Sequence, residues 1–142
     1  MSRSLARELG MQLIFQMDVQ NEFDGAIRQR FLDESKVAAP ERKYIEALTD
    51  ELKKNLADID ALIDKYSAGW PASRMAKVDL AIARLAVTEI AYLKDVPVAV
   101  SINEAVELAK KYGGDSSPKF LNGLLGKIAR SRDAAAGDKA DE

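Results

Sequence analysis

The sequence predicts an all-α protein, with one domain of about seven helices over residues 1–130 and a polar tail over 131–142. Apolar residues recur every three to four positions along most of the chain, and no stretch of useful length alternates as a half-buried β-strand does. Only 8 Gly and 4 Pro interrupt the 142 residues, and the 47% of apolar residues are enough for a packed core.

The first half of the chain is expected to hold four helices. Residues 4–19 and 23–32 each place apolar side chains on one side of an amphipathic helix. The apolar pattern over 41–66 is long for a single helix of a globular protein. Because Asn55 and Asp58 can each cap a helix, we expect this range to contain two helices that divide near residue 55.

The second half is expected to hold three helices. Residues 75–93 are apolar on nearly every face, which is typical of a central helix surrounded by others. Ser101 and Glu104 form the S-x-x-E pattern of a capping box, so we expect the next helix to begin there. The last helix is expected over 117–130, where a Ser-Pro pair suits its start. The tail that follows lacks large apolar residues and is expected to be frayed.

The composition removes most catalytic chemistry. The chain has no Cys and no His, which excludes disulfides, thiolate nucleophiles, imidazole bases and the usual zinc ligands. No Gly-rich phosphate loop, dinucleotide fingerprint or metal-ligand spacing is present, so we predict neither an enzyme nor a cofactor. No apolar run reaches the roughly 18 residues of a membrane span, and a chain without Cys suits the cytoplasm.

A first group of candidate binding residues lies in the first helix. Arg3, Arg7, Met11 and Phe15 are four residues apart and form a slanted stripe. Two guanidinium groups and a ring can bind phosphates and stack a base. The simpler interpretation is that the arginines are solvated and that Phe15 belongs to the core.

A second group lies at the start of the last helix. Lys119 and Asn122 share a face, and Phe120 falls at the edge of the buried side. A cation, a ring and an amide suit unpaired bases, which offer π-faces and hydrogen-bonding edges. Gly123 weakens the helix by roughly 1 kcal/mol relative to Ala, which makes sense either in a tight helix crossing or beneath a closely packed partner.

The charge distribution is compatible with a local basic face. The net charge is −2, yet residues 101–130 carry five cations against three acids. Ordinary solvated faces can also produce such a modest asymmetry. If the two ends of the chain fold side by side, their cations and rings form one surface for an unpaired strand.

Three charged residues lie on the apolar central helix: Asp79, Arg84 and Glu89. A carboxylate pair can perform acid–base chemistry. Buried charges need partners, however, so structural pairing of Arg84 and Glu89 with neighbouring helices is the favoured interpretation.

Three segments, in this order, resemble the NusB family of bacterial transcription antitermination factors: "VDLAIARLAVTEI", "DVPVAVSINEAVELAKKYGG" and "SPKFLNGLLGKI". The opening "ARELGMQLIFQ" and the Trp of "SAGWPASRMAKVD" fit the same pattern, and the resemblance covers about residues 3–130. It implies two packed helical sub-bundles and no catalysis. It also implies binding to single-stranded boxA RNA of ribosomal RNA transcripts together with NusE, a small-subunit ribosomal protein, in support of processive elongation by the transcription elongation complex.

The resemblance assigns roles to individual residues. The implied RNA-binding residues are Arg3, Arg7, Gln12, Arg84, Lys119, Phe120 and Asn122. The implied partner-binding residues are Phe15, Tyr66 and Asp79. The chain departs from many relatives in having only two arginines at its start and in carrying Phe15 where Tyr is common.

Three alternatives remain. The first is a helical protein–protein interaction module that never touches RNA. The second is an RNA-modifying enzyme of the kind in which a similar helical domain precedes a methyltransferase, for which the expected domain leaves no room for a cofactor-binding sheet. The third is a homodimer that masks the RNA surface.

Overall fold

A computed structural model of the chain describes the backbone of residues 2–23 and 25–140, and side chains as far as Arg132. The described elements are α1 (Arg3–Val19), α2 (Gly25–Glu34), α3 (Ala39–Tyr66), the 3₁₀ turn η1 (Ala72–Arg74), α4 (Lys77–Tyr92), α5 (Val98–Tyr112) and α6 (Ser117–Ala140). No strand occurs in the described part, and the all-α prediction is confirmed. No helix within these same residues is long and apolar enough to cross a bilayer.

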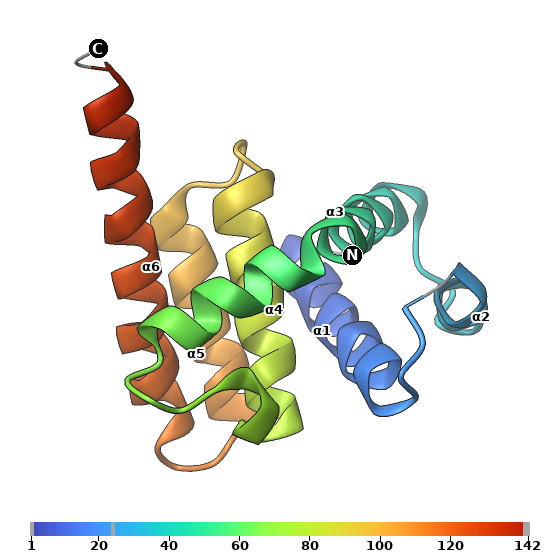
Figure 1. Cartoon of the computed structure of the whole chain (residues 1–142). Coiled ribbons are helices and arrows are strands. Elements are labelled where there is room, and N and C mark those ends of the chain that lie inside the picture. Colours follow the sequence, from blue (N-terminus) through green and yellow to red (C-terminus); the bar gives the residue numbers. More distant parts are fainter. Residues whose placement is uncertain (1, 24, 141–142) are drawn as a thin grey trace.

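The helices form two groups (Figure 1). The helices α1 and α2 and the first part of α3 lie on one side, and α4, α5 and α6 lie on the other. Helix α4 packs against α1, α3, α5 and α6, and every residue from Leu80 to Glu89 is buried. The predicted pair of sub-bundles around a central helix is therefore confirmed.

Helix α3 bends where the sequence predicted a division. Asn55 has non-helical angles, φ −117° and ψ 19°, yet helix continues on both sides. Its Nδ2 donates to the Glu51 carbonyl oxygen at 2.9 Å and to Glu51 Oε2 at 3.1 Å. The Asn55 amide thus bonds to the preceding turn, and α3 consists of two helical segments that meet where the sequence predicted the division. With α3 taken as one helix, the described residues form six α-helices instead of about seven.

The predicted start of α5 is wrong by one turn. The helix begins at Val98, with Pro97 before it at φ −59° and ψ 137°. Ser101 is buried inside the first turn, where its Oγ donates to Glu89 Oε1 at 2.8 Å. Glu104 accepts from Ser4 Oγ of α1 at 2.7 Å. Both residues of the expected capping box therefore form hydrogen bonds with other helices instead of capping α5.

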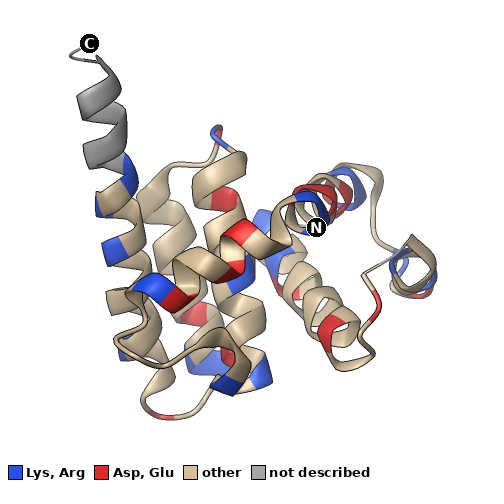
Figure 2. Ribbon diagram, in the orientation of Figure 1, with Lys and Arg blue, Asp and Glu red and all other residues tan. Residues whose placement is uncertain are grey.

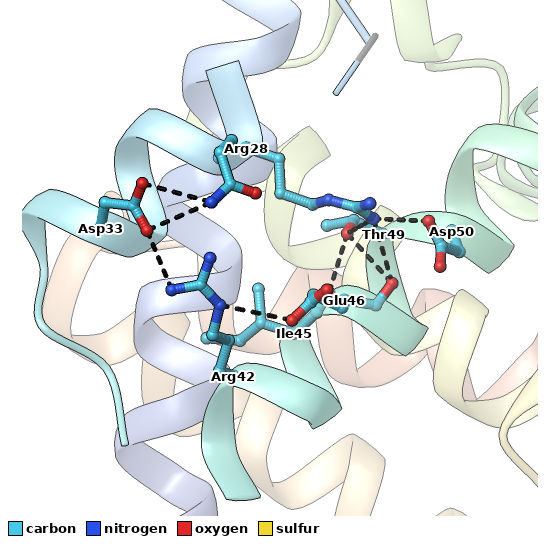
Figure 3. Close-up of polar contacts among 8 residues, drawn as sticks. Arg28, Asp33, Arg42, Ile45, Glu46, Thr49 and Asp50 are labelled. Carbon is cyan, nitrogen blue, oxygen red and sulfur yellow. Dashed lines mark hydrogen bonds and ion pairs between the residues drawn. The ribbon is translucent and has the colours of Figure 1, made fainter. Parts of the chain in front are cut away.

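Helix α2 is held against α3 by charged side chains as well as by its buried Ile27 and Leu32 (Figure 3). Arg28 Nη1 lies 2.5 Å from Asp50 Oδ1 and 3.2 Å from Thr49 Oγ1. Arg42 Nη1 lies 3.0 Å from Asp33 Oδ1. These pairs are partly exposed, so each is expected to contribute only up to about 1 kcal/mol.

The end of α6 differs from the expected boundary. Its backbone continues to Ala140, past residue 130, where the sequence predicted that the helix ends. The side chains of residues 133–142 lie outside the described part, so the frayed tail over 131–142 stays a prediction.

Candidate nucleic-acid interface

The start of α6 is fixed by a contact with the start of α4. Ser117 Oγ donates to Asp79 Oδ2 at 3.0 Å and accepts from the Gly114 amide at 3.0 Å. Asp79 is partly buried in the first turn of α4. This carboxylate, predicted to face a partner protein, therefore also holds the first turn of α6 in place.

One face of α6 is basic and open to solvent. Leu121, Leu124, Leu125 and Ile128 are buried in the core. The exposed side, which we name the α6 face, consists of Lys119, Asn122, Gly123, Lys127 and Arg130. Between Ser117 and Arg132 the helix carries four cations and no acid. Figure 2 shows these Lys and Arg positions along α6.

Phe120 lies at the edge of the α6 face, as its position beside Leu121 predicted. It is half-buried and packs against the core. Together with Leu124 it lines a groove of about 360 Å³ between α6 and the end of α3. Tyr66 and the two residues after it line the same groove. Hydrogen bonding with Ser131 of α6 lowers the pKa of the Tyr66 phenol.

The structure decides between the two interpretations of Gly123. A Cβ atom added at this position would meet nothing within 4 Å. Among the residues that the structure describes, no helix crosses α6 at Gly123, so the tight-crossing interpretation is wrong. The glycine leaves the backbone of the α6 face uncovered, which allows a partner to approach closely.

Replacing Gly123 with Ala is expected to raise the free energy of unfolding by up to about 1 kcal/mol, because Ala favours the helix and its methyl group meets no neighbour. Urea unfolding followed by circular dichroism measures the change. Gly10→Ala is the matched control, since a Cβ atom there would lie 3.0 Å from Leu48 Cδ2. A similar gain at both positions would contradict the open environment of Gly123.

Arg3 is exposed, but it lies far from the start of α6, which carries Lys119, Phe120 and Asn122. Its guanidinium carbon is 4.3 Å from the centroid of the Tyr44 ring, and it lines a hollow with Leu93, just after the end of α4. The first turn of α6 adjoins Asp79 at the start of α4. The 16 residues of α4 span roughly 24 Å. The expectation that the two chain ends lie side by side is therefore wrong.

Arg7 is buried, with 3% of its surface exposed. Its Nε lies 2.8 Å from Glu89 Oε2, and Glu89 is fully buried. Glu89 also accepts hydrogen bonds from Ser101 Oγ and from the Tyr44 hydroxyl. Burial and the nearby Glu89 carboxylate raise the pKa of Tyr44, so its phenol stays a donor. Arg7 is therefore a buried partner of Glu89 in the core. Its position does not allow the expected direct contact with RNA.

Arg84 is also committed to internal partners. Its Nε and Nη2 lie 2.9 and 2.8 Å from the two carboxylate oxygens of Asp60, and its Nη1 lies 3.3 Å from Asp18 Oδ1. Only 7% of the residue is exposed. The structural-pairing interpretation of Arg84 and Glu89 is confirmed, and Arg84, like Arg7, does not present its guanidinium group to a ligand.

Gln12 connects α1 to α5. Its Nε2 donates to the Tyr112 hydroxyl at 3.1 Å, and Tyr112 in turn donates to Glu8. Lys111 Nζ lies 2.6 Å from Glu8 Oε1. Hydrogen bonds from Lys111 and Tyr112 lower the pKa of Glu8. Gln12 is half-buried in this link, and Phe15 packs partly buried against the core.

The sequence analysis assigned no binding role to one prominent side chain. Trp70 is 58% exposed in the loop between α3 and η1, and the two residues after Tyr66 in this loop line the groove beside Phe120. A large aromatic residue inside a Gly- and Pro-containing loop was the available signal.

Comparisons with known proteins agree with this geometry. The NusB family model matches residues 4–130. A transcription antitermination protein NusB from Alkaliphilus oremlandii is 49% identical over 127 residues, which are 89% of this chain and 92% of the relative. Another, from Agathobacter rectalis, is 46% identical over 91% of this chain and 100% of the relative.

Solved structures show the same fold. A structure of T. maritima NusB has a TM-score of 0.85 and 34% identity, with 92% of each chain covered. A structure of antitermination factors NusB and NusE in complex with double-stranded RNA has a TM-score of 0.82 and 25% identity, with 92% of this chain and 99% of that chain covered. Sequence and fold agree over nearly the whole chain, which therefore belongs to the NusB family.

Proposed function

We propose that this protein is a transcription antitermination factor that binds unpaired boxA RNA through the α6 face, together with NusE. The α6 face itself is the observation that carries the proposal. It places exposed cations, an amide and an uncovered glycine beside a half-buried ring, without an acid, in a chain whose net charge is −2. Such a combination suits a strand that offers phosphates and unstacked bases.

Each side chain has a specific task in this proposal. Lys119, Lys127 and Arg130 contact phosphates and fix the position of the strand. Phe120 offers the exposed part of its ring to one base, and Asn122 reads a base edge. Arg3, at the other end of α4, contributes only when the RNA is long enough to reach it.

The partner surface is proposed to adjoin the RNA surface. The known complex of NusB with NusE and RNA supports both partners for a member of this family. Tyr66, implied as a partner-binding residue, lines the same groove as Phe120. Phe15 and Asp79 complete the implied partner set. Assembly with the transcription elongation complex, a non-enzymatic role and a cytoplasmic location follow from the same function.

The decisive experiment is a titration of labelled boxA RNA with the full chain, with and without NusE, at two salt concentrations. Each phosphate contact is expected to add about 0.7 to the slope of log affinity against log salt. A duplex of the same sequence should bind less tightly, because its bases are not free to stack. No binding in any condition would favour the pure protein-interaction module, and a dimer seen by light scattering that dissociates on adding RNA would indicate a masked surface.

Replacing Phe120 with Ala is expected to weaken RNA binding by roughly 1–3 kcal/mol while the helix content stays unchanged, because one stacked base loses its platform. Fluorescence anisotropy measures the affinity. Phe31→Ala is the matched control, since Phe31 is also a half-buried ring but belongs to α2. Equal affinities of the two variants would contradict the role of Phe120.

A further inference from the structure

The loop between α3 and η1 has a fixed shape. The Ala72 amide donates to Asp64 Oδ1 at 2.7 Å, and the buried Ser67 Oγ donates to the Trp70 carbonyl oxygen at 2.5 Å. Ala68 has φ +55°, a value that a residue with a Cβ atom adopts only where its surroundings hold it. These contacts place Trp70 on the surface in a defined position.

Trp70 presents only its ring faces. Its Nε1 donates to the Arg74 carbonyl oxygen at 3.1 Å, so the single polar atom of the side chain already has a partner. The residue is nevertheless 58% exposed. Because its Nε1–H is already bonded, the indole cannot select a ligand by hydrogen bonding. It can stack on a flat group at low entropic cost, since the same bond fixes its orientation.

The surroundings of Trp70 are basic. The loop and α6 form the walls of one groove, in which Ser67 and Ala68 face Phe120. Residues 65–77 and 116–132 contain no acidic residue, and the Asp64 carboxylate just before them accepts from the Ala72 amide. Their cations are Lys65, Arg74, Lys77, Lys119, Lys127, Arg130 and Arg132. An aromatic ring among cations suits an unpaired nucleic-acid strand, which is a polyanion whose bases offer π-faces. It suits a basic protein surface less well.

We propose that Trp70 is a second stacking residue of the RNA site, so that a strand held by the α6 face crosses the groove and stacks one further base on the indole. Arg74, which is exposed at the end of η1, contacts the phosphate beside that base. This inference rests on the proposed function and adds to it the path of the strand, which runs from Phe120 across the groove to Trp70.

The chain contains only one Trp, so its fluorescence reports on this position alone. Adding single-stranded boxA RNA is expected to quench the Trp70 emission, because a stacked base lies against the indole. Trp70→Leu is expected to weaken binding about 5- to 150-fold, whereas Trp70→Phe keeps most of the affinity. Leu fills a similar volume without a π-face, and circular dichroism verifies that both variants are folded.

Val19→Ala is the control for a general effect of exposed apolar surface, since Val19 is 56% exposed on α1. The inference is overturned if Phe120→Ala weakens RNA binding while Trp70→Leu does not and the emission is unchanged; the proposed function then still stands. It is also overturned if Trp70→Leu weakens binding of NusE alone and leaves binding of RNA alone unchanged. Absence of RNA binding by the unchanged protein would refute the proposed function itself.

Discussion

Replacing Arg7 with Met is expected to lower the free energy of unfolding by about 3–5 kcal/mol, because it leaves a charge without its partner inside the core. Glu89 is fully buried, and the Arg7 Nε is the cation bonded to it, at 2.8 Å. The hydroxyl groups of Ser101 and Tyr44 that also bond Glu89 are neutral donors and cannot replace the lost charge. Urea unfolding followed by circular dichroism measures the effect.

A double-mutant cycle separates the pair from its surroundings. Glu89→Met alone is expected to be as damaging as Arg7→Met, whereas the double variant should recover much of the loss, since apolar side chains of similar volume fill the site without a charge. Arg42→Met is the control, because the Arg42–Asp33 pair at 3.0 Å is partly exposed and worth at most about 1 kcal/mol. A loss at Arg7 no larger than that at Arg42 would show that the buried pair is not essential.

Replacing Arg84 with Met is expected to cost about 1–3 kcal/mol, because the partly exposed carboxylates of Asp60 and Asp18 lose a charged hydrogen-bonding partner. This guanidinium group joins three helices, since it belongs to α4 and lies within 3.3 Å of carboxylate oxygens of Asp60 in α3 and Asp18 in α1. Removing it takes away a contact that crosses between the two sub-bundles. Thermal unfolding measures the loss.

A second substitution identifies which carboxylate matters more. Asp60→Leu is expected to restore part of the stability of the Arg84→Met protein, because Asp18 keeps Lys77 Nζ at 3.2 Å from its Oδ2. Asp60 has no such second cation among the ion pairs of the described residues. If Asp18→Leu rescued the variant better than Asp60→Leu, the bidentate contact with Asp60 would not be the stronger of the two.

The sequence pattern correctly predicted burial and exposure where these depend on the apolar spacing within one helix. The apolar faces of residues 75–93 gave α4 its central place, and helical spacing placed Lys119, Phe120 and Asn122 on the outer side of α6. A helix that is apolar all round needs neighbours on every side, and a helix with one apolar side exposes the other.

The wrong predictions concern side chains that bond to a residue distant in the sequence instead of to their own helix or to solvent. Ser101 fits a capping box, but Glu89 of α4 takes its hydroxyl group. Arg7 shares a stripe with the exposed Arg3, yet its partner Glu89 is 82 positions away in the sequence. The spacing within a single helix contains no information about such a contact, so neither the burial of Arg7 nor the distance between Arg3 and the start of α6 could be predicted.

The contact between Arg7 and Glu89 has a consequence for the order of events on the ribosome. Helix α1 leaves the exit tunnel long before α4, so a nascent chain holds Arg7 without its carboxylate until Glu89 has been synthesised. The N-terminal half therefore cannot complete its core before α4 has been synthesised and has emerged. Its final packing waits for the arrival of α4, and the two sub-bundles are expected to become native together.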